Sequence, residues 1–481
     1  MHRPPARRGF SRAFGAIVLT GLTALITLAS FDPRGGTEIA AVSALPHYAA
    51  RAARTCDNCH ADPTGWHNPE LSLRKCNLSC STCHVNPTGG GMRTVAGRYY
   101  GQATLPLWFP SHRPAKDANR QFSALRIAKT RRNRLPDPAF GKPLGGSAPL
   151  AYEEERYNGL RADPLFQLGL DTRYAFWFAG ATLFFPMQFD IHAALHPYKH
   201  LTIYSTSGFL AKSKGYAATF GRPTPFMVKD LFVMLHQLPY MSYVRVGNFL
   251  PPFGTYLDDH TVATRRDFGL HSGLLQSRVS GIELGLAPNY PYLNVAVFRP
   301  NRQDAFRGDD PDNDGNPPFF GVDGWGGAIA AGWRDLGWQL GVSAMLRRRG
   351  LEDGGDSEAV ALSWGFNPWY YSDWLPLVYL GELAYGRKQR PVVTSKQSYG
   401  HMASFHQLRA LVHNGVDLLV RYEFADPDFE IRDDHYHRLA LGGDLILLPG
   451  FSIHGEFRMQ FNAGADAVTT HDAVLYFRGW Y

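Results

Sequence analysis

From about Phe166 to the C-terminus, apolar and polar residues alternate at every second position in segments of about ten residues. In one segment, Phe451, Ile453 and Phe457 alternate with polar residues that include His454 and Glu456. An alternation with period two predicts β-strands with one apolar and one polar face. The same pattern recurs over residues 168–178, 338–347 and 416–424.

These segments are long for a soluble β-sandwich, and their second face carries strongly charged residues. That pattern is typical of a transmembrane barrel with lipid outside and water inside. About sixteen segments fit between residue 166 and the end, so we predict an all-β fold, an antiparallel barrel with both ends in the periplasm. The last segment, Ala473 to Tyr481, is similar to the C-terminal recognition signal of outer-membrane barrels. A secreted β-sandwich with an aromatic end is the alternative.

Composition agrees with a barrel. The 481 residues exceed the usual size of one compact core, and 44% are hydrophobic, with 49 Gly, 31 Phe, 23 Tyr and 10 Trp. Beyond the N-terminus, no stretch approaches the roughly 20 apolar residues that a membrane-spanning helix needs. The net charge of +7 does not indicate a nucleic-acid partner.

The N-terminus is typical of an export signal. Basic residues precede an apolar run over residues 13–29, and small residues follow up to Ala44. We expect a signal peptide over residues 1–44, cleaved after Ala44. An uncleaved membrane anchor is the alternative.

All five cysteines lie between residues 56 and 83, and four of them form two C-x-x-C-H motifs. Two cysteines at this spacing form thioether bonds with the vinyl groups of a c-type haem, and the following histidine binds the iron. The motifs therefore predict two haems, with covalent attachment and proximal axial ligation by Cys56, Cys59 and His60 for the first and by Cys80, Cys83 and His84 for the second.

The two motifs belong to a repeat. Cys56-x-x-Cys59-His60-x-x-Pro63-Thr64-Gly65 matches the residues from Cys80 to Gly89 at an offset of 24 residues. A zinc ribbon has a similar cysteine spacing, but a histidine directly after both pairs favours haem. The fifth cysteine, Cys76, has no assigned role.

The distal axial ligands are open at this stage, because they need not be close in sequence. The local candidates are His47, His67, Met92 and His112, and each has the alternative of an ordinary surface or packed residue. Two histidine ligands lower the reduction potential of a haem, whereas histidine with methionine raises it.

These features divide the chain into a signal peptide (1–44), a small, irregular or helical di-haem cytochrome c segment (45–110), a basic linker (111–165) and a porin-like outer-membrane barrel (166–481). The linker can steer an acidic redox partner or be a solvated connector. Residues 246–254 resemble a motif of phosphate-selective-type porins, and Pro251-Pro252 predicts a strand end there. Asp258-Asp259-His260 then forms either a metal site or a solvated turn.

A short C-x-x-C-H segment joined to a barrel resembles the fused cytochrome-porins of the outer membrane, a family with iron-oxidising members. The best-known members carry one haem, whereas this chain has two motifs. The resemblance implies electron conduction between a periplasmic cytochrome or other carrier and an extracellular donor or acceptor such as iron. It also implies contact with outer-membrane lipid and leaves open an Fe(II) oxidase activity. The alternative is a solute-selective porin whose haem segment serves as a plug or redox sensor.

Overall fold

The computed structural model describes residues 84–94, Trp108 and most of residues 165–480. Gaps within the last range fall at 180, 199, 211–226, 260, 271–276, 288–290, 301–323, 335–336, 350–354, 369–374, 390–397, 414, 449 and 465–468. The predicted signal peptide, the basic linker and several predicted haem ligands lie outside the described residues. These ligands are His47, Cys56, Cys59, His60, His67, Cys80, Cys83 and His112.

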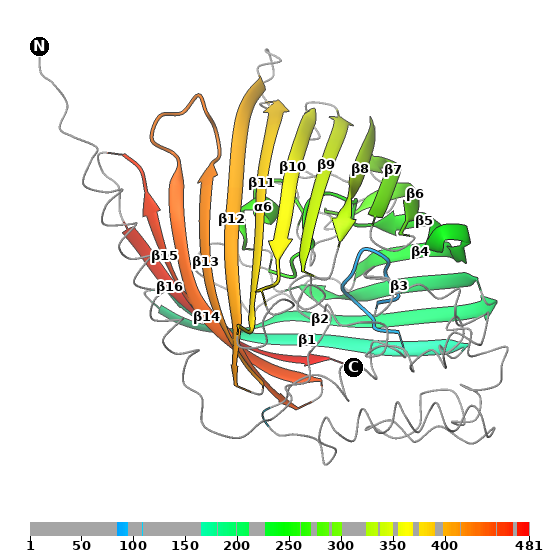
Figure 1. Ribbon diagram of the computed structural model, residues 1–481, viewed down its shortest axis with the longest axis horizontal. Helices are drawn as coiled ribbons and strands as arrows, with labels where there is room; N and C mark the ends of the chain where they lie inside the picture. The colour runs from blue at the N-terminus through cyan, green and yellow to red at the C-terminus, as the bar shows by residue number, and fades with distance from the viewer. Residues whose placement is uncertain are drawn as a thin grey trace, which may run out of the picture.

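The described chain forms one closed antiparallel barrel of sixteen strands, each paired with its sequence neighbours, and β1 pairs with β16 to close it (Figure 1). This confirms the predicted fold and strand number. The strands are β1 (Phe166–Ala179), β2 (Ala181–Tyr198), β3 (Leu201–Leu210), β4 (Met227–Leu238), β5 (Ser242–Phe249), β6 (Val279–Leu286), β7 (Pro291–Pro300), β8 (Gly324–Arg334), β9 (Trp338–Arg349), β10 (Ser357–Phe366), β11 (Leu377–Gln389), β12 (Ser398–His413), β13 (Val416–Asp426), β14 (Tyr436–Leu448), β15 (Phe451–Asn462) and β16 (Thr469–Trp480).

The two faces of each strand differ as the alternation requires. In β1, Leu168 and Leu170 point outward and are exposed, whereas Gln167 and Arg173 point inward and are buried. Other strands repeat the arrangement, with exposed Val295 and Val297 on the outside of β7. An apolar outer surface around a polar interior, the lumen, is the pattern of barrels that cross a bilayer.

The two rims of the barrel carry different connections. Strands β2–β3, β12–β13 and β14–β15 are joined by two residues each, and the helical turn η4 (Pro239–Met241) joins β4 to β5. The opposite rim carries the long connections after β3, β5 and β7. Because the strand number is even, β1 begins and β16 ends at the rim of short turns. In bacterial barrels this rim faces the periplasm.

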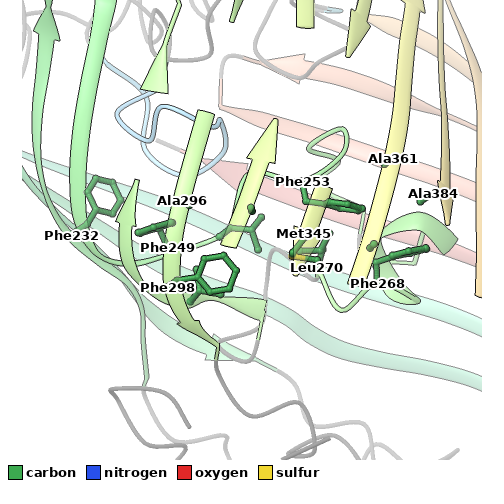
Figure 2. Close-up of a cluster of buried hydrophobic side chains, with 14 of the residues drawn as sticks. Phe232, Phe249, Phe253, Phe268, Leu270, Ala296, Phe298, Met345, Ala361 and Ala384 are labelled. Carbon is green, nitrogen blue, oxygen red and sulfur yellow. The ribbon is translucent and has the colours of Figure 1, made fainter. Parts of the chain in front are cut away.

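The described residues of the connection from β5 to β6, which are 250–259, 261–270, 277 and 278, fold into the lumen instead of extending away from the rim. We call this part of the chain the inner loop. β5 ends at Phe249, one residue short of the Leu250-Pro251-Pro252 junction, and so confirms the strand end that the sequence predicted. The connection contains one helical turn, α6 (Ala263–Arg266), and its apolar side chains join an interior cluster. Figure 2 shows Phe253, Phe268 and Leu270 of this inner loop close to Met345 of β9 and Ala384 of β11. Among the described residues, no helix is long and apolar enough to cross a membrane.

Candidate functional site

The residues that follow the second C-x-x-C-H motif lie inside the barrel (Figure 1, blue). His84 and Arg93 form an antiparallel bridge, and the amide of Val85 donates to the carbonyl of Met92 at 3.0 Å. Residues 84–94 therefore form a compact turn, which we call the docked segment. Val85 and Met92 are buried in the same apolar cluster as Phe232 and Phe249 of the barrel wall.

Two polar contacts hold the docked segment against the wall. The guanidinium of Arg245 on β5 donates to Asn86 Oδ1 at 2.9 Å, and the amide of Met92 donates to the hydroxyl of Tyr204 on β3 at 3.2 Å. The guanidinium of Arg93 lies 5.2 Å from the ring centre of Trp480, at the end of β16. The docked segment therefore contacts β3 and β5 on one side of the β1–β16 closure and β16 on the other.

Three consecutive glycines allow this turn. Gly89, Gly90 and Gly91 all have positive φ angles, which residues other than glycine rarely adopt. A Cβ atom at Gly90 would overlap with the hydroxyl of Tyr256, and one at Gly91 would overlap with that of Tyr204. The first repeat has Trp66 and His67 at the positions of Gly90 and Gly91.

Arg245 is the centre of a buried charge network. It is fully buried, forms an ion pair with Glu283 of β6 at 2.7 Å and lies 4.3 Å from the ring centre of Phe249. Glu283 also accepts a hydrogen bond from Tyr243. A buried ion pair needs such additional partners to offset its desolvation. These contacts fix the position of the Arg245 guanidinium that donates to Asn86.

Ion pairs hold the inner loop against strands β1, β13 and β16. Asp258 pairs with Arg173 of β1 and, at 2.9 Å, with Arg478 of β16, and Asp259 pairs with Arg421 of β13 at 2.8 Å. Both carboxylates are therefore paired with arginines of the barrel wall. His260 lies outside the described residues. Within the described ranges, no group of three or more His, Cys, Asp and Glu residues is placed to hold a metal ion.

The inner loop also meets the docked segment, since Tyr256 lies against Gly90. Burial, and secondly the charge of Asp258, raises the pKa of the Tyr256 hydroxyl above its ordinary value, so this residue is neutral. The inner loop crosses the lumen from β5 to β1 and β13–β16. Together the loop and the docked segment occupy the centre of the barrel.

His192 of β2 supplies a histidine from the barrel wall beside the docked segment. Its Nδ1 atom lies 3.0 Å from the hydroxyl of Thr206 and 3.2 Å from that of Tyr204. Its Nε2 atom is buried and has no hydrogen-bond partner in the structure. Since the Tyr204 hydroxyl already accepts from the amide of Met92 and from Thr206, it donates to Nδ1, which places the ring proton on Nε2.

Of the haem ligands predicted from the sequence, the structure describes two, His84 and Met92, and both are buried in the docked segment. The sequence did not single out His192, Tyr204 or Arg245. The alternation predicts that they face the lumen, but nothing local indicates that they meet residues 84–94.

No family model and no curated protein matches this chain. Among solved structures, it is similar to the outer-membrane protein OmpT of Vibrio cholerae, with 9% identity and a TM-score of 0.47, over 66% of this chain and 97% of that one. It is also similar to an anion-selective porin from Comamonas acidovorans, with 12% identity and a TM-score of 0.45, over 66% and 99% of the two chains. The outer membrane channel DcaP of Acinetobacter baumannii matches with 10% identity and a TM-score of 0.44, over 66% and 97%.

Proposed function

We propose that this chain is an outer-membrane cytochrome-porin that conducts electrons between a periplasmic carrier and an extracellular donor or acceptor such as iron. One observation carries the proposal: the residues directly after the second C-x-x-C-H motif are docked in the lumen of a membrane-type barrel. A haem attached at that motif would lie in or next to the lumen.

The cofactors of the proposal are two c-type haems, whose iron supplies one-electron transfer when they are bound. Cys56, Cys59 and His60 would hold the first haem, and Cys80, Cys83 and His84 would hold the second. The barrel wall surrounds the docked segment with buried side chains and presents an apolar surface to lipid. The apolar band of such barrels is about 25 Å tall, which gives a second redox centre a physical use.

The interior arrangement favours conduction of electrons over passage of solutes. Asp258 and Asp259 fix the inner loop to β16 and β13. Arg245 of β5 and Tyr204 of β3 fix the docked segment to the other side of the lumen. A solute-selective porin with a haem plug remains the competing function, and it requires these two elements to leave an aqueous path.

The test uses intact cells and the purified full-length protein. Ferrous iron added outside cells should rapidly reduce the haems of the wild type, and the purified chain should carry two covalent haems. The double variant Cys80→Ala/Cys83→Ala should retain one haem and lose rapid reduction. The matched control Cys76→Ala, which lies outside both motifs, should behave as the wild type.

Two results would overturn the proposal. Fewer than two covalent haems per wild-type chain would remove the pair of redox centres. Two haems that external iron does not reduce, in a protein that passes small solutes into liposomes, would establish the porin function instead.

A further inference from the structure

We infer that the lumen contains a binding site for a small inorganic oxyanion, such as phosphate or sulfate, formed by Arg347 of β9, Ser357 of β10 and Lys388 of β11. None of these residues belongs to the docked segment or to a C-x-x-C-H motif. The inference is therefore independent of the haems, and it adds a ligand to the interior of the barrel.

The three residues form one row across neighbouring strands. Arg347 lies directly opposite Ser357, and Ser357 lies directly opposite Lys388. Neighbouring strands are about 4.8 Å apart, so the backbones of the two cationic residues are separated by roughly 10 Å, with the hydroxyl between them. β9 and β11 end within two residues of the row, at the rim of the long connections, which is extracellular in bacterial barrels.

The two cations converge on the inner loop. Nη1 of Arg347 donates to the carbonyl of Phe268 at 3.2 Å, and Nζ of Lys388 donates to the carbonyl of Asp267. These carbonyls belong to consecutive residues, so both positive charges are brought to the same place. Capping these carbonyls is the simpler role for the two side chains, but it leaves their charges uncompensated.

Arg347 is a buried cation without a paired carboxylate among the described residues. Its exposed fraction is 3%, and its Nε atom has no hydrogen-bond partner. The charges that act on it are those of Arg349 and of Arg265 in the inner loop, which have the same sign. Because a buried charge is costly unless it is paired, this arrangement requires a negative charge from outside the described chain.

Two nearby carboxylates are engaged elsewhere. Asp267 forms an ion pair with Arg266 at 2.8 Å, and Glu382 of β11 accepts a hydrogen bond from the amide of Thr255. Neither carboxylate forms an ion pair with a cation of the row. A bound anion would supply the counter-charge that these side chains do not.

The donors of the row match an oxyanion. The guanidinium of Arg347 offers Nε–H, and the ammonium of Lys388 has two N–H groups besides the one that binds the inner loop. Ser357 and Lys388 are partly exposed, so an anion can reach the row from the lumen. A tetrahedral oxyanion has enough oxygen atoms to accept from all three side chains at once, through charge-assisted hydrogen bonds to the two cations.

The experiment is a calorimetric titration of the purified full-length protein in detergent with inorganic phosphate and, separately, with sulfate. The wild type should show one saturable site per chain. Arg347→Gln keeps a donor for the carbonyl of Phe268 but removes the charge, and it should weaken binding about 10- to 100-fold. Ser357→Ala removes a neutral donor and should weaken binding about 2- to 10-fold.

Arg348→Gln is the matched control. Arg348 is the next residue of β9, points to the outer face and pairs with Asp356 at 2.9 Å, so this variant should bind as the wild type does. Thermal unfolding gives a second measurement. Phosphate should raise the midpoint of the wild type and of Arg348→Gln by mass action, but not that of Arg347→Gln. In buffer without phosphate or sulfate, Arg347→Gln should be at least as stable as the wild type, because it removes an uncompensated buried charge.

The inference is overturned if the wild type binds neither anion saturably, if Arg347→Gln binds as tightly as the wild type, or if Arg348→Gln loses as much affinity. A lower stability of Arg347→Gln in anion-free buffer also overturns it, since the cation would then serve only to cap the inner loop. Failure of the proposed function has a different signature, because it appears as fewer than two covalent haems and leaves anion binding unchanged.

Discussion

Replacing Arg245 with methionine removes the cation that joins the barrel wall to the docked segment. Glu283 would remain buried without its charged partner, and removing one member of a buried ion pair typically costs about 3–5 kcal/mol. The segment would also lose the hydrogen bond from a charged donor to Asn86, worth about 1.5–3 kcal/mol. That second loss lowers the ratio of docked to undocked segment roughly tenfold to a hundredfold.

Two assays separate these effects. Urea titration of the barrel in lipid vesicles, followed by tryptophan fluorescence, measures the free energy of unfolding. Trypsin cleavage after Arg93, followed by mass spectrometry, measures undocking, since this residue is held against Trp480 in the docked state. Both the free energy of unfolding and the protection from trypsin should fall in Arg245→Met.

The double variant Arg245→Met/Glu283→Gln is the matched control. It removes both charges, so the barrel should recover part of its free energy of unfolding, whereas Arg93 should stay open to trypsin. Equal losses of stability in the single and double variants would refute the ion-pair argument. Full protection of Arg93 in Arg245→Met would refute the role of Asn86 in docking.

Three further predictions concern the segment, the inner loop and the outer face. Gly91→Ala should undock the segment and speed trypsin cleavage after Arg93 without lowering barrel stability. The added Cβ would overlap with Tyr204, and the positive φ angle costs alanine about 1–2 kcal/mol more. Unchanged cleavage would contradict this prediction. Asp258→Asn should loosen the inner loop and increase channel openings in planar bilayers, and a trace as quiet as that of the wild type would count against the ion-pair anchor. Val297→Arg places a charge on the lipid face and should cost about 2–4 kcal/mol in vesicles, whereas Tyr198→Arg at the rim should cost at most about 1 kcal/mol.

The fold could be predicted because its signal is local. In β1, the exposed Leu168 and the buried Arg173 follow from alternation alone, and sixteen such segments define a barrel without knowledge of their pairing. The end of β5 could also be predicted from local sequence, because Pro251 and Pro252 have no backbone N–H to donate to a neighbouring strand.

The interior could not be predicted, because its contacts join residues far apart in the chain. Asp258 is placed by Arg173 and Arg478, which lie at opposite ends of the barrel sequence. Alternation shows that His192 faces the lumen but not what stands opposite it. The C-x-x-C-H motifs are local, so the sequence predicts a ligand role for His84 but not the residues that surround it.

The contact between Arg93 and Trp480 has a consequence for biogenesis. Trp480 belongs to β16, whose pairing with β1 closes the barrel, so the docked segment contacts a strand of the closure itself. A peptide cannot easily be threaded into a closed barrel. We therefore expect residues 84–94 to be in place before β1 and β16 pair, so that the segment serves as an internal template around which the sheet closes.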